Sequence, residues 1–438
     1  MPEPLNLRAD FPPVSTEAWE AVIKADLKGA DYEKRLVWRT EEGLAVRPYY
    51  RKDSAPALEG LFSNAEWQIA QGAEPSADAI RADLLHEAGA HAVQELGYGI
   101  AAGADLLAAG AKNIEFVFAV GPSYFMEIAK LRAVRILWEQ VVAAFGEECP
   151  MRLHVRTPQR NKSVYDRYSN LLRVTTEALS AAIGGCDSLD VVPFAFDEHL
   201  ALNVQRILKE ESHLDAVADP AAGSYYIEAL TDELARKAWK LFQQVEAEGG
   251  YAKAAESIEK ALAETRATRA KAYSSRRRAL VGVNNYPNVT EKEPAVAKSK
   301  QYRIAEPFEK LRARTAAHAE ATGRYPKVLL LKRGDVKMKG ARSNFCFNFF
   351  GCAGFDVVES EELASADLII LCSSDAEYLA FAQEVCTAVK VPVLVAGNPV
   401  DHIEALKAAG VQGFVHIQSD AIQTLTEWQD KLGMKGIQ

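Results

Sequence analysis

The sequence predicts an α/β protein of more than one domain, because short apolar strands alternate with amphipathic helices along most of the chain. Runs such as Ile114–Val120 and Met151–Arg156 are each followed by a helical pattern, and the same alternation returns after Pro326. The length of 438 residues is too great for one ordinary domain and suggests two or three, each able to bury a core.

The composition excludes several classes of protein. Hydrophobic residues make up 48% of the chain and charged residues 25%, as in soluble globular proteins. The formal charge of −9 argues against general binding to nucleic acid or to an anionic membrane. No apolar run reaches the roughly 20 residues of a membrane span, and the polar N-terminus lacks the apolar region of a signal peptide, so we expect a cytoplasmic chain. The six cysteines form no CxxC, and we interpret them as small buried apolar side chains.

Residues 1–60 predict an arm outside the main core. An amphipathic helix begins at Thr16 and ends near Gly29, and a hairpin follows with Leu36–Arg39 and Leu44–Tyr49 as its strands. Such a segment cannot make a core alone, so we expect it to pack on the rest of the chain or on a partner.

Residues 61–280 predict parallel strands separated by helices. The expected strands are Ile114–Val120, Met151–Arg156, Leu189–Val192 and Asp215–Ala218. The expected helices are His86–Leu107, Met126–Val142, Tyr165–Ile183, Glu198–Lys209 and a long one after Gly223. This is an α/β unit with right-handed crossovers, but four strands are too few for a closed barrel of eight.

Residues 281–325 predict a connector, and residues 326–438 predict a second α/β domain. The connector is rich in Asn, Pro and Lys and ends with a helix at Phe308–Ala321. Five strands are expected after it, at Lys327–Leu331, Asp356–Val358, Asp367–Cys372, Val391–Ala396 and Gly413–Ile417. Short strands with helices between them favour a doubly wound, flavodoxin-like sheet. A ligand of such a sheet would lie at the loops Lys332–Gly340, Ser373–Asp375 and Gly397–Pro399.

Several long motifs, in one order, resemble the methylmalonyl-CoA mutase family. They are FPPVSTEAWEAVIKADLKGADYEKRLVWRTEEGLAVRPYY, HEAGAHAVQEL, IEFVFAVGPSYFMEIAKLRAVRILWE, DPAAGSYYIEALTDELARKAW and RRRALVGVNNYPN. The resemblance implies a partial TIM-type (β/α) barrel, with the earlier half nearly absent between Trp67 and His86, followed by a cobalamin-binding-like domain. It also implies that the N-terminal arm wraps a partner subunit.

In catalytic members, the resemblance implies an Asp-x-His-x-x-Gly loop whose histidine ligates cobalt. Asp335 and Gly340 fit this pattern, but Lys337 stands at the histidine position, and a charged ammonium has no lone pair for cobalt. Ser373 and Ser374 resemble the serine that hydrogen-bonds the displaced base, while Gly397 lies in a stretch that replaces a Gly-Gly pair. The six candidate cofactor residues are therefore Asp335, Lys337, Gly340, Ser373, Ser374 and Gly397, in a domain that we expect no longer to bind cobalamin in the family's manner.

The barrel motifs predict no catalytic residue and no metal ligand. The resemblance implies a histidine before the HEAGA helix that hydrogen-bonds the thioester carbonyl, and Leu84 occupies that position. His86 is interpreted as a capping or packing residue, with a ligand role as the alternative. His91 lies five residues further on, a poor spacing for a metal pair on one helix face.

Two polar groups keep alternatives open. Arg276-Arg277-Arg278 could pair with a CoA phosphate, or could solvate and complement a helix end. The acids Asp187, Asp190, Asp197 and Glu198 could include an acid-base pair, but no nucleophile or metal motif accompanies them, so capping and turn roles are favoured.

The resemblance implies the small, non-catalytic subunit of a heterodimeric mutase. Its large subunit would bind adenosylcobalamin and interconvert methylmalonyl-CoA and succinyl-CoA, so that acyl-CoA is met only through the complex. Two other hypotheses stay open: a divergent mutase that is active itself and binds cobalamin without a protein histidine, and an interaction protein outside any mutase.

Overall fold

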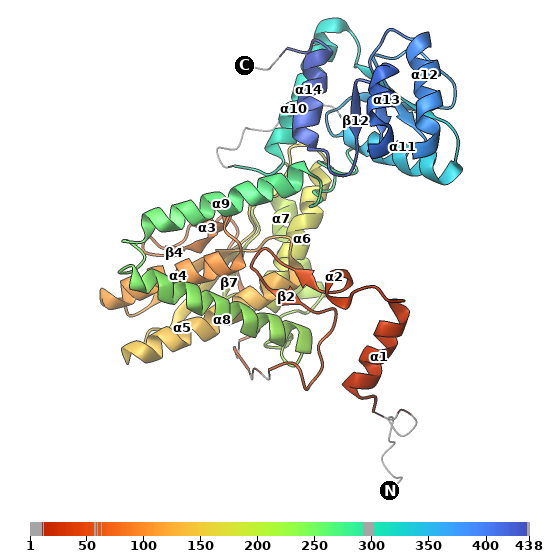
Figure 1. Cartoon of the computed structure of the whole chain (residues 1–438). Coiled ribbons are helices and arrows are strands. Elements are labelled where there is room, and N and C mark those ends of the chain that lie inside the picture. The colour runs from red at the N-terminus through yellow and green to blue at the C-terminus, as the bar shows by residue number, and fades with distance from the viewer. Residues whose placement is uncertain are drawn as a thin grey trace.

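The structure is a computed structural model that describes residues 11, 13–56, 58, 60–62, 64–291 and 302–435. It contains two five-stranded parallel sheets and one small hairpin. The first sheet and its helices occupy one end of the molecule, and the second sheet occupies the other (Figure 1). The expected α/β class is therefore confirmed.

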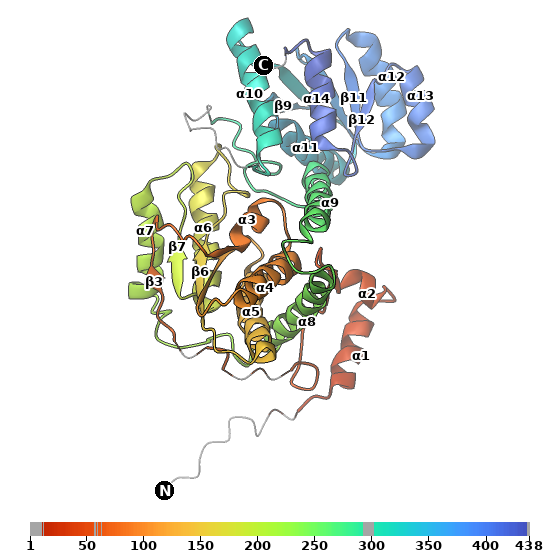
Figure 2. The ribbon, with the colours of Figure 1, turned by 90° about the vertical axis from the view of Figure 1, so that its left-hand side faces the viewer.

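The N-terminal arm has the predicted helix and hairpin. Helix α1, Thr16–Asp26, is capped by Ser15 and has no buried residue. The short helix α2, Tyr32–Arg35, leads to strands β1, Trp38–Arg39, and β2, Ala45–Val46, which pair antiparallel. Both views show α1 projecting away from the body of the molecule (Figures 1 and 2).

The first sheet has the order β3-β7-β6-β5-β4, with every neighbouring pair parallel. Its strands are β3 Gln68–Ile69, β4 Ile80–Arg81, β5 Ile114–Ala119, β6 Met151–Arg156 and β7 Ser188–Asp190. Three of the four predicted strands are thus present. The fourth, Asp215–Ala218, was wrong: these residues form turns and bends, and Val217 is 61% exposed. Strands β3 and β4 were not predicted.

This sheet is open, because β3 and β4 lie at opposite edges and do not pair. Residues 70–79 join them by crossing the face that a closed barrel would enclose. This crossover is tied down where the Gly72 amide donates to Asp190 Oδ1 (3.0 Å) and Ser76 Oγ donates to Glu115 Oε2 (2.7 Å). A ten-residue connection thus stands where the resemblance places the missing half of the barrel.

The helices of this unit share an apolar core with the other face of the sheet (Figure 2). They are α3 Ala82–Glu87, α4 Ala92–Ala108, α5 Tyr124–Phe145, α6 Arg167–Ile183, α7 Glu198–Arg206 with a π turn at Ile207–Glu211, α8 Tyr225–Ala247 and α9 Ala255–Ser274. Helix α8 packs on α4 and α5. The prediction of a single helix at His86–Leu107 was wrong, because the helix is interrupted between the end of α3 and the start of α4. Gly89 has φ +111° there, a conformation that side chains disfavour, and His91 caps α4.

The motif that begins at Asp219 surrounds a buried arginine. Arg132 of α5 is fully buried and donates to both Asp219 oxygens (2.8 and 3.0 Å) and to Glu228 Oε1 (3.1 Å). The Gly223 amide donates to the same Glu228 oxygen (2.9 Å). Three residues of the DPAAGSYYIE motif, Asp219, Gly223 and Glu228, thus take part in the hydrogen bonds around one buried guanidinium.

The connector is partly folded into the second unit. Val283 and Asn284 are buried, and helix α10, Glu306–Thr322, packs beside the last helix. Leu280 and Phe308 share an apolar core with the second sheet. Residues 292–301 of the predicted connector lie outside the described residues, and the division at 280 and 325 stays a prediction.

The second sheet has the order β12-β11-β10-β8-β9, all parallel, which is the strand order of a flavodoxin-like sheet. Its strands are β8 Lys327–Lys332, β9 Asp356–Ser360, β10 Leu368–Cys372, β11 Val393–Ala396 and β12 Gly413–Val415. Its helices are α11 Val336–Gly351, α12 Tyr378–Ala388, α13 Ile403–Ala408 and α14 Ala421–Lys431. The five predicted strands are confirmed. Among the described residues, no helix is both long and apolar enough to cross a membrane.

Candidate functional site

The candidate site lies at the carboxyl edge of the second sheet, between β8 and β10. Strand β8 lies between β9, at one edge, and β10, and the chain leaves β8 and β10 toward opposite edges of the sheet. Such a switch point opens a crevice at the carboxyl ends, where ligands of doubly wound sheets bind. The loops after β8, β10 and β11 bring together the predicted residues.

Asp335, Lys337 and Gly340 lie where α11 begins. Asp335 is the N-cap of this helix, and its Oδ1 accepts a hydrogen bond from the Met338 amide (2.7 Å). Lys337 and Gly340 are exposed, and a Cβ at Gly340 would meet no atom within 4 Å. The loop therefore has a structural cap in Asp335 and no histidine.

Ser373 and Ser374 are engaged by a residue that was not predicted, Glu377. Its Oε2 lies 2.7 Å from Ser373 Oγ and 2.6 Å from Ser374 Oγ, and it accepts a longer bond from the Ser374 amide (3.2 Å). These hydrogen bonds, from Ser374 first and then Ser373, lower the pKa of Glu377 to about 2, so it is a carboxylate at neutral pH. A Cβ at Gly334, whose φ is +79°, would overlap this carboxylate.

Arg342, also not predicted, occupies the space beside Gly397. Its guanidinium donates to the Ala396 carbonyl (2.6 Å), to Tyr378 Oη (2.9 Å) and to Asp375 (2.7 Å). A Cβ at Gly397, whose φ is +142°, would overlap the same guanidinium. The Tyr378 hydroxyl is buried and also accepts from the Ser373 amide (3.2 Å), so it joins the two polar groups into one network.

A signal for this arrangement is present in the sequence. Ser374-x-x-Glu377 is a capping-box pattern, and the structure contains that capping box at a short 3₁₀ turn. Arg342 carries no such local signal, because its partners follow two other strands.

The carboxyl edge of the first sheet contains the other predicted positions. Leu84 is 48% exposed and lines a cavity of about 60 Å³ together with Arg81, Asp83 and Arg156. Arg81 pairs with Asp83 through two hydrogen bonds (2.8 and 2.7 Å). Arg156 pairs with Asp190 (3.0 Å). The apolar side chain of Leu84 thus lies beside arginine and aspartate side chains that are already paired with one another.

His86 is part of a buried ion network. Its Nδ1 lies 2.6 Å from Glu95 Oε1, and Lys130 contacts Glu95 (2.7 Å), Glu127 (2.6 Å) and the Ala119 carbonyl (2.7 Å). Burial lowers the pKa of His86, so the imidazole is neutral. Its position in the core favours the packing role over a ligand role.

His91 is the N-cap of α4, where its ring accepts from the Gln94 amide (3.3 Å). Burial lowers the pKa of His91 to about 4. Within the described parts of the chain, no three His, Cys, Asp or Glu side chains form a group that could hold a metal.

The arginine triplet and the acids serve structural contacts. Arg276 donates to the Asn284 carbonyl (2.9 Å) and stacks on Phe345, 5.0 Å from its ring centre. Arg278 pairs with Glu41 of the hairpin (2.9 Å). Two of the three guanidiniums thus join segments of the chain.

Among the acids, Asp187 accepts from the Leu153 amide (2.7 Å), and Asp190 holds Arg156. Asp197 caps α7, where it accepts from the His199 amide (2.7 Å), and Glu198 stands in the first turn of that helix. The structure does not bring these acids together as an acid-base pair with a nucleophile.

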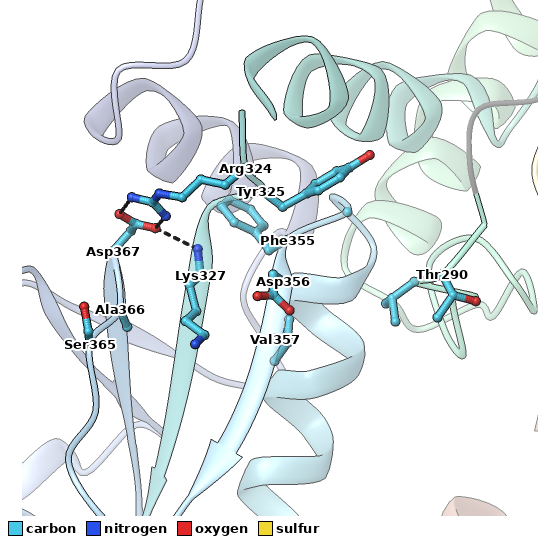
Figure 3. Close-up of a pocket in the computed structure, with 12 residues that line it drawn as sticks. Thr290, Arg324, Tyr325, Lys327, Phe355, Asp356, Val357, Ser365, Ala366 and Asp367 are labelled. Atoms are coloured by element: carbon cyan, nitrogen blue, oxygen red, sulfur yellow. Dashed lines mark hydrogen bonds and ion pairs between the residues drawn. The ribbon is translucent and has the colours of Figure 1, made fainter. Parts of the chain in front are cut away.

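A larger cavity of about 640 Å³ lies at the opposite, amino edge of the second sheet (Figure 3). Arg324 and Asp367 close one side with two hydrogen bonds (2.6 and 2.8 Å), and the Lys327 amide also donates to Asp367 (2.8 Å). Because ligands of doubly wound sheets bind at the carboxyl edge, we do not assign the cofactor position to this cavity.

Comparison with known proteins agrees with the geometry. The sequence model described as methylmalonyl-CoA mutase matches residues 42–324. The chain is 32% identical to the methylmalonyl-CoA mutase small subunit of Porphyromonas gingivalis, over 98% of this chain and 99% of that protein. It is 35% identical to the small subunit of Streptomyces virginiae, over 82% of this chain and 65% of that protein. It is 41% identical to the methylmalonyl-CoA mutase of Cereibacter sphaeroides, over 46% of this chain and 32% of that protein.

An open parallel sheet followed by a sheet with flavodoxin-like strand order defines the class as a two-sheet α/β protein. The chain belongs to the methylmalonyl-CoA mutase family. Within the family it is similar to the small subunits, as the motifs predicted. The alignment to the Porphyromonas protein covers 617 positions, against 438 residues here, so that protein contains a large segment that this chain lacks.

The carboxyl-edge loops, as they stand, do not fit the cobalamin of catalytic family members. The loop after β8 offers an ammonium in place of an imidazole, and an ammonium cannot donate electrons to cobalt. A ligand could approach the backbone closely at Gly334 and Gly397, because glycine has no side chain. Glu377 and Arg342 already occupy the space beside these two glycines.

Proposed function

We propose that this chain is a non-catalytic small subunit that supports a large subunit in the interconversion of methylmalonyl-CoA and succinyl-CoA. The observation that carries the proposal is the pair Leu84 and Lys337, at the two positions where the resemblance implies histidines in catalytic members. In this proposal adenosylcobalamin is held by the large subunit in the cytoplasm, and acyl-CoA is met through the complex.

The open first sheet supports the same proposal. Radical chemistry on a cofactor requires that the protein bind, orient and exclude water around reactive species. Strands β3 and β4 are unpaired at their outer edges, and the crossover of residues 70–79 covers the face of the sheet. Such a half barrel cannot enclose a substrate on its own.

The exposed N-terminal arm supports the proposed contact with a large subunit. Helix α1 has no buried residue, and Trp19 and Val22 are 46% and 62% exposed. Apolar side chains on a projecting helix favour contact with another protein surface.

Two alternatives remain. A divergent mutase active by itself would need to bind cobalamin without a protein imidazole. An interaction protein outside any mutase would have no large-subunit partner.

Co-purification with the candidate large subunit tests the proposal. We expect one co-eluting complex in gel filtration, mutase activity that requires the large subunit, and no activity from this chain alone. Activity of the isolated chain would favour the divergent mutase. Absence of any complex with a large subunit encoded beside this chain would favour an interaction protein outside any mutase.

A further inference from the structure

We propose that Glu377 and Arg342 act as built-in substitutes for a ligand, so that this chain closes its own cofactor crevice. The inference rests on the proposed function in one respect, that the cofactor belongs to the partner. It goes beyond the proposed function because it names two residues that close the crevice, and neither belongs to the loop from Asp335 to Gly340.

The two side chains come from different elements, Glu377 from the turn after β10 and Arg342 from α11. Glu377 lies at the switch point between β8 and β10, the place where a doubly wound sheet binds its ligand. Arg342 reaches from α11, which follows β8, to Asp375 after β10 and to the Ala396 carbonyl at the end of β11. Each side chain lies against a glycine whose missing Cβ would otherwise leave the backbone open, Gly334 in one case and Gly397 in the other.

The polar groups around the crevice are paired inside the chain. The Ser374 hydroxyl would need an acceptor in an empty crevice, whereas Ser373 Oγ also donates to the Arg333 carbonyl (2.8 Å) and the Ala396 carbonyl also accepts from Tyr378. Glu377 supplies a carboxylate within 2.7 Å of both hydroxyls, and Arg342 supplies a donor 2.6 Å from the carbonyl. The polar groups that could recognise a ligand are therefore already paired inside the chain.

The buried hydroxyl of Tyr378 connects the two positions. The Tyr378 hydroxyl accepts from Arg342 (2.9 Å) and from the Ser373 amide (3.2 Å), and it donates to the Ala396 carbonyl. The two filled positions thus form one network that crosses three loops. It follows that restoring the cobalt ligand alone does not restore a cobalamin site.

The test compares three versions of the full-length chain, without the partner, in visible-absorption titrations with adenosylcobalamin. The versions are the wild type, Lys337→His, and Lys337→His combined with Glu377→Ala and Arg342→Ala. We expect Lys337→His to bind no better than the wild type, and the triple variant to bind more tightly than Lys337→His by about tenfold or more. The matched control adds Glu404→Ala and Lys407→Ala, an exposed ion pair of α13, to Lys337→His and should give no gain.

Retention of cobalamin by Lys337→His alone, or no gain in the triple variant, would overturn the inference and leave the proposed function standing. A wild-type chain that retains cobalamin would overturn both. If the triple variant does not fold, a thermal-unfolding cycle of Glu377→Gln and Ser374→Ala decides. Non-additive losses support the network, and additive losses overturn it.

Discussion

At the scale of single residues, the stability of the first unit depends on buried charges that are paired inside the core. Arg132 is the clearest case, since its guanidinium is fully buried between Asp219 and Glu228. We expect Arg132→Ala to lower the free energy of unfolding by about 3–5 kcal/mol, because it leaves two buried carboxylates without their charged partner. Urea unfolding measures the loss.

The matched control is Arg236→Ala on α8, which breaks an exposed pair with Asp232. An exposed pair one helical turn apart contributes about 0.3–0.5 kcal/mol, so the control should change stability little. Equal losses in the two variants would contradict the assigned role of Arg132.

Single residues also mark the limit of prediction from sequence. The capping box at Ser374 and Glu377 can be read locally, because its partners are three residues apart. The network of Lys130, Glu95 and His86 cannot, because Lys130 and Glu95 are 35 positions apart and meet only after folding. Candidate residues could therefore be located on loops, and Glu377 by its capping box, while Arg342, whose partners are distant in the sequence, could not.

At the scale of elements, close helix packing predicts opposite effects of one substitution at two glycines. A Cβ at Gly103 of α4 would lie 2.8 Å from Phe116 and from Trp138, whereas at Gly340 of α11 it would meet nothing within 4 Å. Gly103→Ala should destabilise the protein, because overpacking costs about 1–3 kcal/mol. Gly340→Ala should stabilise it by up to about 1 kcal/mol through helix propensity. Chemical unfolding of both variants checks the contrast, and a stabilising Gly103→Ala would contradict the packing.

The hairpin between β1 and β2 is anchored to α9 through Glu41. Burial raises the pKa of Glu41, but the hydrogen bond and charge of Arg269, with the charge of Arg278, lower it to about 2. A carboxylate with a depressed pKa stabilises the fold above its unfolded pKa, and this stability is lost as pH falls toward the folded pKa. The stability gap between wild type and Glu41→Gln should therefore be complete above about pH 5 and shrink toward about pH 2. Urea unfolding across that range measures it, and a constant gap would contradict the anchoring.

Strand prediction failed for the two-residue strands. Strands β5 and β6 have six residues each with buried neighbours and were predicted, whereas β3 and β4 have two residues and no period. Asp215–Ala218 looked like a strand because it is short and apolar, but no neighbouring strand pairs with it. An apolar run of four residues thus cannot distinguish a strand from a turn.

At the scale of the whole molecule, helix α1 of the arm has no buried residue and projects from the body (Figure 1). We expect Trp19→Ala with Val22→Ala to weaken binding to the large subunit by about tenfold or more, because exposed tryptophans often dominate interfaces. The thermal unfolding of the isolated chain should change little, since the ring of Trp19 contacts Tyr49 and Arg51 of the same arm. Val217→Ala, an exposed apolar residue of a loop, is the control and should leave binding unchanged. Equal binding by the arm variant would contradict an arm that holds the partner.

The proposed non-catalytic role is tested most directly by a visible-absorption titration of the purified chain with adenosylcobalamin, repeated with the large subunit present. We expect that this chain alone leaves the spectrum unchanged, and that the mixture retains cobalamin in one complex through gel filtration. A chain that alone shifts the spectrum and keeps the cofactor through gel filtration would contradict the proposed role, because Lys337, Glu377 and Arg342 would then not prevent binding.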